Sequence, residues 1–264
     1  MTSSTPATYT TELSKGQGAV EETLNLLQVW EPGMTAESLA ERVVREGSLG
    51  RSTAVRTRDL VQRVFVRRYL VPNDEPARCL KRLATRRADR AVIRQIMLVY
   101  TARLHQILRD FIVEEFWGRY SAGAERISRA DAEQFIARAH ADGRISPSWS
   151  PVMRVRVARY LTGALADFGL LSEGRETAKE IHPFRILSGT ALYLAHEVHF
   201  KGFSDNSILE LPDWKLFGIA RDEVVRELDK LAHDGHFILQ YAGDLLRISW
   251  RYKNMEECVD AIAR

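Results

Sequence analysis

The pattern that most limits the fold is a long series of apolar residues at helical spacing. Between Ile93 and Phe116, apolar side chains recur every three or four residues, which is the spacing of one face of a helix. The same period returns elsewhere between turn residues. It predicts helices at about 15–30, 35–46, 53–69, 90–120, 129–142, 151–168, 183–199 and 220–234, with a short one near Trp214.

Near the C-terminus the period changes to two. Leu246, Ile248, Trp250 and Tyr252 alternate with polar residues, after the stretch 237–241 and a Gly-containing turn. Such alternation is typical of a half-buried strand, and three helices followed by one hairpin predict a winged-helix module. The expected fold is therefore mainly α: a basic helix-turn-helix region (1–95), a helical body packed with it (96–173) and a C-terminal winged-helix module with one β-hairpin (174–264).

Basic charge is concentrated in residues 51–94. This block has thirteen Arg and Lys residues against four acidic ones, a net charge of +9 in a chain whose total is +3. Charge gathered in this way indicates a surface that binds a polyanion. The whole chain prefers Arg to Lys by 31 to 7, which accounts for the choice of Arg but not for the scarcity of acids. The block therefore predicts nucleic-acid contact.

Inside this region, a turn at 47–50 joins the helix at 35–46 to a basic helix at 53–69, the order of a helix-turn-helix unit. At 100° per residue, three of its Arg residues lie within about 40° of one another, opposite Phe65. A merely solvated face would interleave acids for pairing, and within this helix only Asp59 is available. A nearly pure Arg stripe predicts phosphate contact with weak sequence preference. The expected DNA-binding residues are the stripe Arg56, Arg63 and Arg67, with Arg51, Arg58 and Arg68, extended by Arg82, Arg86 and Arg87.

Two other charged regions differ from this block. Arg154, Arg156 and Arg159 form a second, smaller cationic cluster, whereas residues 173–264 carry a net charge of −4. The last helix of the expected winged helix has a net charge of −2. Because attraction to phosphate dominates affinity for nucleic acid, a structural or protein-contact role is favoured for this module. Its wing could still touch a DNA backbone through Arg247, Arg251 and Lys253.

No catalytic constellation stands out, and we expect no enzyme, cofactor or metal. The chain has neither GxxxxGK[ST] nor GxSxG, the signatures of a phosphate loop and a nucleophile elbow. His196 and His199 are one turn apart but lack further ligands at metal-binding spacing. The stretch 91–113 contains too many charges for a membrane span. Two isolated cysteines and an N-terminus without an apolar run predict a cytosolic protein.

The N-terminal sequence from Tyr9 to Thr23, with the Leu27–Met34 segment and the Gly50-Arg51 turn, resembles the BrxA family of bacterial BREX phage-defence systems. The resemblance implies a cytosolic, non-enzymatic factor with a NusB-like helical body that binds double-stranded DNA. It also implies operation beside other BREX proteins, including a methyltransferase and ATPases. Lys15 has two interpretations: a phosphate contact, because helix N-termini favour anions, or simple exposure.

Two alternative functions remain open. The acidic winged helix could dock other defence proteins, which would make the chain an assembly adaptor. The NusB-like body instead suggests RNA binding. Both alternatives belong to different classes from a DNA-binding accessory protein, and each makes a separate experimental prediction.

Overall fold

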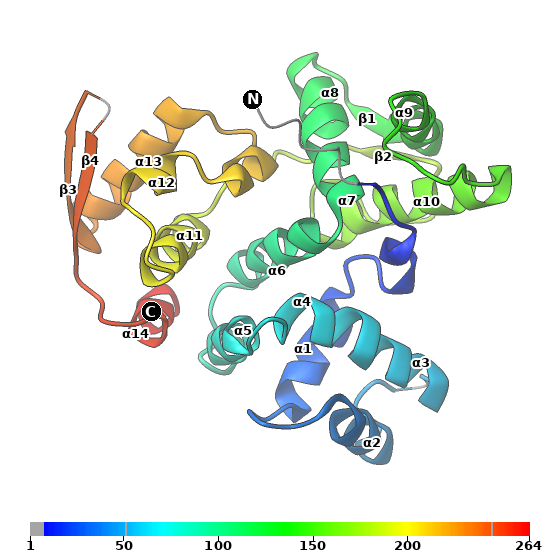
Figure 1. Ribbon diagram of the computed structural model, residues 1–264, viewed down its shortest axis with the longest axis horizontal. Helices are drawn as coiled ribbons and strands as arrows, with labels where there is room; N and C mark the ends of the chain where they lie inside the picture. The colour runs from blue at the N-terminus through cyan, green and yellow to red at the C-terminus, as the bar shows by residue number, and fades with distance from the viewer. Residues whose placement is uncertain (1–7, 51, 244) are drawn as a thin grey trace. The chain divides into compact units, whose positions relative to one another are not determined.

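The computed structural model describes residues 8–50, 52–243 and 245–264, apart from the side chain of Lys15. The described part is mainly helical, with two short antiparallel strand pairs (Figure 1). This confirms the expected mainly α class with a C-terminal hairpin. The chain divides into two compact units, and each unit combines two separate stretches of sequence. Unit 1 consists of residues 1–71 and 98–184, and unit 2 of residues 72–97 and 185–264.

Unit 1 begins with a short 3-10 helix and a tight turn, where the sequence predicts one helix over 15–30. The 3-10 helix η1 covers Glu12–Lys15, and the α-helix α1 covers Val20–Val29. Between them, Gln17 and Ala19 adopt positive φ, a conformation that interrupts a right-handed helix. A Cβ atom on Gly18 would lie 2.5 Å from a side-chain carbon of helix α10. Glycine therefore lets this turn lie directly against α10.

The expected helix-turn-helix segment starts with α2 (Ala36–Glu46). A single run of helix follows the turn and consists of α3 (Ala54–Asp59), the π-helix η2 (Leu60–Val66) and α4 (Arg67–Tyr69). We call this run the basic helix. Threonine side chains accept the first hydrogen bonds of both α2 and α3, as expected of N-caps. The helices predicted at 35–46 and 53–69 are thereby confirmed, although the second contains a π segment.

The helix expected over 90–120 is interrupted at His105. It is divided into α6 (Arg90–Leu104), α7 (Gln106–Asp110), the π-helix η3 (Phe111–Phe116) and α8 (Trp117–Ser121). The backbone of His105 has φ −117° and ψ 88°, outside the helical region, and its side chain is buried. A buried His105 therefore separates α6 from α7, an interruption that the apolar periodicity of the sequence does not predict.

Helices α9 (Arg129–Ala141) and α10 (Pro151–Asp167) pack against each other, close to their predicted bounds. The strand β1 (Arg126–Ser128) pairs antiparallel with β2 (Ala178–Glu180). Strands of three residues are too short to show a period of two, which explains why the sequence pattern does not predict them. The largest fully buried aromatic residues of unit 1 are Trp30, Phe65, Tyr69, Phe111, Phe116, Phe135 and Phe168.

In unit 2, helix α14 (Met255–Ile262) packs against both α5 (Glu75–Thr85) and α11 (Ser188–Phe200). Cys79 on α5 and Cys258 on α14 are both free and buried. The sequence predicts that α11 begins near residue 183. Instead the chain is non-helical up to Leu187, and the first turn of α11 follows it.

The remainder of unit 2 contains three helical segments followed by a hairpin. The short helix α12 (Asn206–Leu209) and the 3-10 helix η4 (Pro212–Phe217) precede α13 (Arg221–His233). Strand β3 (Phe237–Ala242) then pairs antiparallel with β4 (Leu245–Trp250). Along β4, the buried side chains of Leu246 and Ile248 alternate with exposed ones, as the period of two predicts, whereas in β3 only Phe237 is buried. α13 and the hairpin thus agree with the sequence prediction.

Candidate nucleic-acid interface

The basic helix is fixed in unit 1 by an aromatic face. Phe65 is fully buried, with its ring centroid 6.2 Å from that of Trp30 and 5.8 Å from that of Tyr69. Tyr69 in turn lies edge-on to Tyr100 at 6.0 Å. The inward position predicted for Phe65 is confirmed. Because aromatic rings contribute large buried areas, this face holds the helix in place and leaves the opposite side to solvent.

Four Arg side chains of the basic helix are exposed. Arg56 is 69% exposed, Arg63 52% and Arg67 41%, and Arg58 is exposed as well. Exposure is the condition that phosphate contact requires, so all four remain candidates; Arg56, Arg63 and Arg67 share one face of the helix, whereas Arg58 lies on the other side at 100° per residue. We call these four residues the exposed Arg set.

Acidic residues accompany most of this set, which the local sequence pattern does not show. Arg63 pairs with Asp59 at 3.2 Å within the helix. The other partners come from further away in sequence: Glu12 pairs with Arg67, and Glu22 lies 4.0 Å from Arg56. Exposed ion pairs of this kind contribute at most about 1 kcal/mol. They reduce the net charge of the surface without blocking access to it.

Arg68, predicted to bind phosphate, is instead buried, with 3% of its surface exposed. Its guanidinium donates hydrogen bonds to the backbone carbonyls of Gly18 at 2.9 Å and Gln17 at 2.6 Å. Burial lowers the pKa of this group because desolvation penalises the charged form. Arg68 therefore holds the turn before α1 and does not belong to the candidate surface.

The residues predicted to extend the surface lie in unit 2, around the end of α5. Arg82 forms a two-pronged ion pair with Asp260, at 2.6 and 2.7 Å, and Arg86 lies 2.9 Å from the same carboxylate. The Arg82 guanidinium holds the pKa of Asp260 below its usual range. Arg87 is exposed, with φ +59°. Two of these three side chains thus join α5 to α14 within unit 2.

Two further predicted positions fall outside the description. Arg51 lies outside the described residues, and so does the side chain of Lys15. The two interpretations of Lys15 are therefore not separated by the structure.

The last helix before the hairpin presents a surface of the opposite character. On α13, Arg221 pairs with Glu210, and Lys230 pairs with Glu227 at 2.6 Å. Asp222 and Asp229 are exposed on the same helix. With two of its three Arg and Lys side chains paired and additional acids exposed, α13 is a poor surface for phosphate.

His196 and His199 belong to an aromatic cluster. His196 is buried with its Nδ1 2.9 Å from the Leu192 carbonyl, and its ring lies edge-on to Trp250 at 4.6 Å. His199 stacks on the same Trp250, with the ring centroids 4.3 Å apart. Burial lowers the pKa of His196 to about 4. Among the described residues, no group of three or more metal-ligating side chains comes together.

The described part of the chain is thus a helical protein of two compact units, with an exposed Arg set on the basic helix of unit 1. The chain belongs to the BrxA family, whose family model matches residues 7–197. This confirms the resemblance seen in the sequence and identifies a protein associated with BREX defence. The family is not known as a catalytic one. A search of curated proteins finds no match to the chain. None of the described helices combines the length and hydropathy needed to cross a bilayer.

Proposed function

We propose that this protein is a non-catalytic accessory factor of a BREX phage-defence system that binds double-stranded DNA in the cytosol. The observation that supports this most directly is the exposed Arg set on the basic helix of unit 1. The planar guanidinium group binds phosphate oxygens through paired hydrogen bonds. Contacts to phosphate position a protein on DNA without reading its bases, so sequence preference should be weak.

The ion pairs and the helical positions on this surface determine how much each Arg of the exposed Arg set should contribute to DNA binding. Arg56, Arg63 and Arg67 each have a carboxylate neighbour, which a DNA phosphate must displace. Arg58 is exposed and has no ion-pair partner among the described residues. At 100° per residue, however, Arg58 lies on the opposite side of the helix from Arg56, Arg63 and Arg67, so the main contribution to binding on one face should come from those three residues, and Arg58 should contribute less.

A salt titration of duplex binding tests the proposal. If the four members of the exposed Arg set each contact one phosphate, log affinity should fall with log salt at a slope of about −3.6. Replacing Arg56, Arg63 and Arg67 together by Gln should weaken binding to all duplex sequences and reduce the steepness of the slope by about 2.7. Fluorescence anisotropy with duplexes of unrelated sequence measures both quantities.

The matched control removes three cations from α13: Arg221→Gln, Arg226→Gln and Lys230→Gln. It changes the net charge by the same amount and should leave DNA affinity close to that of the parent protein. Equal weakening by the two triple variants would refute the assignment to the basic helix. Competition with structured RNA at matched salt completes the test, because preferential binding of RNA would favour the alternative of a NusB-like RNA-binding factor.

A second candidate function is an assembly adaptor, and it has its own supporting observation. On the hairpin of unit 2, Ile238 and Leu245 are 66% and 61% exposed, close in sequence to the acidic α13. The helices predicted at 183–199, near Trp214 and at 220–234 correspond to α11, η4 and α13, and followed by this hairpin they have the order of a winged helix. The partners proposed are other BREX proteins, among them the methyltransferase and the ATPases.

The adaptor function is best tested with the full chain, because unit 2 also includes residues 72–97 and is not contained in a C-terminal fragment. Co-purification with co-expressed BREX methyltransferase or ATPase should be lost when Ile238 and Leu245 are both replaced by Lys. Loss of co-purification with unchanged DNA affinity would separate this function from DNA binding. Failure of the parent chain to retain either protein would count against the adaptor.

A further inference from the structure

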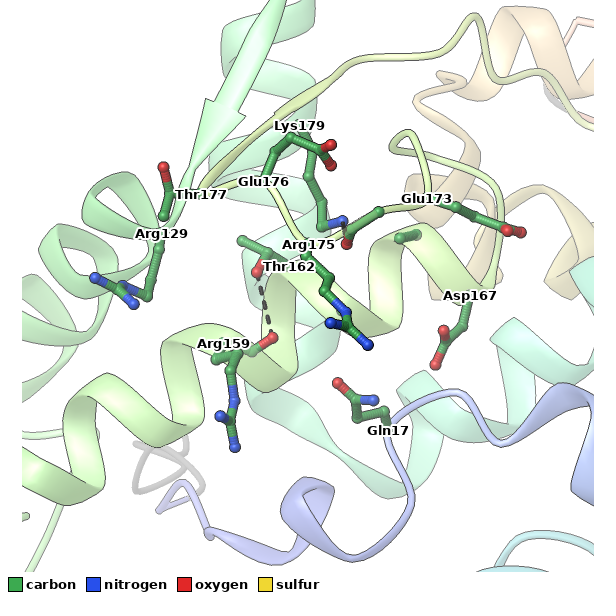
Figure 2. A pocket seen from close by; sticks show the side chains of 13 residues that line it. Gln17, Arg129, Arg159, Thr162, Asp167, Glu173, Arg175, Glu176, Thr177 and Lys179 are labelled. Carbon is green, nitrogen blue, oxygen red and sulfur yellow. Dashed lines mark hydrogen bonds between the residues drawn. The ribbon is translucent and has the colours of Figure 1, made fainter.

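A cavity of about 550 Å³ lies beside the C-terminal half of α10 in unit 1. Its walls come from α10, from the 173–177 loop and from the turn that contains Gln17 (Figure 2). This volume is within the range of small-molecule sites. Of the smaller cationic cluster on α10, Arg159 is the member that lines the cavity.

Two guanidinium groups reach this space from different elements. Arg159 projects from α10 and Arg175 from the loop, and Figure 2 shows the Arg175 side chain directed toward Gln17, with Arg159 projecting to one side of it. Both are exposed, and neither has an ion-pair partner among the described residues. By contrast, Arg129 at the edge of the cavity is paired with Glu133 at 3.3 Å. The Arg159 guanidinium lies over the ring of Tyr160, 5.4 Å from its centroid, a contact that leaves its N–H groups without an ion-pair partner; both cations can therefore bind a ligand.

Acidic side chains also line the cavity and limit what it can bind. Asp167, Glu173 and Glu176 are among the lining residues. Asp167 is partly occupied, because its carboxylate accepts a hydrogen bond from the Gly18 backbone N–H at 3.0 Å. These acids repel a diffuse polyanion. A compact anion placed between the two guanidinium groups can still form short, charge-assisted hydrogen bonds.

The walls are held in position by contacts that support the cationic groups. Lys179 is buried and donates hydrogen bonds to the carbonyls of Ser172 at 3.2 Å and Gly174 at 2.7 Å. These bonds fix the loop that carries Arg175. Because Lys179 is buried and bonded to two carbonyls of the loop, the loop has a defined conformation.

On the opposite wall, Gln17 lies against a glycine of α10. A Cβ atom on Gly163 would approach the Gln17 Oε1 to 2.2 Å, so the amide occupies space that any other residue would fill. Glycine weakens a helix interior, and Gln17 has φ +46°, a costly conformation for a residue other than glycine. A glycine inside a helix and a positive φ at Gln17 are both locally unfavourable, and together they place the Gln17 amide at the cavity.

We propose that this cavity binds a phosphate monoester, with Arg159 and Arg175 as its cationic groups and the Gln17 amide as a neutral hydrogen-bonding group. A monoester carries a charge of about −1.5 to −2 at pH 7, which two guanidinium groups balance. It also has a single substituent, so it can enter a walled cavity, whereas an interior phosphodiester is flanked on both sides. A free nucleotide and the 5′ end of a DNA strand both present this group.

Isothermal titration of the full chain tests the proposal with three probes: inorganic phosphate, deoxyadenosine monophosphate and a short single strand with or without a 5′ phosphate. Saturable binding that requires the monoester is the expected result. Preference for the mononucleotide assigns a small-molecule ligand, and preference for the 5′-phosphorylated strand assigns a DNA end. No saturable binding of any probe at millimolar concentration would overturn the proposal.

Variants locate the binding in the cavity. Arg159→Gln and Arg175→Gln should each weaken binding by about tenfold, since each removes a charge-assisted contact. Arg156→Gln is the matched control: it is exposed on the same helix, is not among the residues that line the cavity, and changes the net charge equally. Weakening by Arg156→Gln equal to that by Arg175→Gln would contradict the site. If Arg159→Gln lowers the melting temperature, the exposed loop variant Arg175→Gln decides alone.

This site is separate from the proposed DNA surface. The Gln variants of the exposed Arg set should leave monoester binding unchanged, and Arg175→Gln should leave the salt slope of duplex binding unchanged. Failure of one proposal is therefore distinguishable from failure of the other.

Discussion

The two π-helices of unit 1, η2 and η3, bury their side chains with the same four-residue period but satisfy a buried charge in different ways. Around η2 the buried pairs include residues 64 and 65, then 68 and 69, and around η3 they include 111 and 112, then 115 and 116. Each series places one charged residue in a buried position, Arg68 in the first and Glu115 in the second.

The partners of these two charges differ in kind. Arg68 is held by backbone carbonyls of the turn before α1, which cannot move away without distorting that turn. Glu115 is held by the side chains of Arg119 and Arg138, which are 31% and 52% exposed. Those guanidinium groups can turn to water if the carboxylate is lost. The comparison teaches that the cost of removing a buried charge depends on the freedom of the groups left behind.

The largest effect is therefore expected for Arg68→Met. The substitution keeps most of the side-chain volume but leaves the carbonyls of Gln17 and Gly18 without their donors, at about 1–3 kcal/mol for each buried unsatisfied group. We expect a loss of about 3 kcal/mol in the free energy of unfolding, measured by urea denaturation. Arg67→Met is the control, because Arg67 is exposed and its surface ion pair is worth at most about 1 kcal/mol. Equal losses in the two variants would contradict the role given to Arg68.

The second effect is a loss of stability in acid through His105, which lies between the two π-helices in sequence. Desolvation and then the charges of Arg68 and Arg67 lower the pKa of His105 to about 3 in the folded chain. The unfolded state has the higher pKa, so it takes up protons first, and stability falls as the pH falls from about 6.5 toward 3. The expected loss from this residue between pH 7 and pH 5 is about 2 kcal/mol. His105→Gln should remove that part of the pH dependence in urea titrations, and an unchanged pH profile would contradict the assignment.

A smaller effect is expected for Glu115→Gln. The neutral amide cannot accept two charge-assisted hydrogen bonds as strongly as the carboxylate, but Arg119 and Arg138 remain accessible to water. We expect a loss of about 1–2 kcal/mol in the free energy of unfolding. Glu133→Gln, which removes an exposed carboxylate paired with Arg129, should change it by at most about 1 kcal/mol. A loss in Glu115→Gln as large as in Arg68→Met would remove the distinction between the two segments.

The smallest effect links the first π segment to His105. Because Arg68 contributes to the low pKa of His105, Arg68→Met should raise that pKa while leaving it below the ordinary value, since desolvation is the largest cause. NMR titration of the imidazole resonances measures the change. A pKa of His105 that does not respond to Arg68→Met would show that the charge of Arg68 does not contribute to it.

Periodicity predicted most of the helices but not their pitch. The rule of 100° per residue selected Arg56, Arg63 and Arg67 and placed Phe65 inward, and these four positions agree with the observed exposure. By the same count Arg68 lies about 60° from Phe65, between Val64 and Tyr69 on the inward face, so its burial also follows from 100° per residue. The π segment itself, Leu60–Val66, is the part that the apolar spacing did not predict.

Ion pairs between residues far apart in sequence could not be predicted from the local sequence pattern. Glu12 and Asp260 are far in sequence from Arg67 and Arg82, their respective partners, so a count of acids within the basic block overestimates the free positive charge. The cavity beside α10 has the same origin, because Gln17, Arg159 and Arg175 meet only after folding. One missed element did carry a local signal: Asn254 caps α14, and Glu257 follows it at the spacing of a capping residue and its partner.

The rate at which the two cysteines are alkylated can be used to measure local unfolding of unit 2. Both thiols of the chain lie in unit 2, and burial raises the pKa of Cys79 to about 12 and that of Cys258 well above its ordinary value. Only the exposed thiolate reacts with alkylating reagents, so labelling must wait for local unfolding. The time course of alkylation would report how often unit 2 unfolds locally. Unit 1 contains no cysteine and would not be labelled.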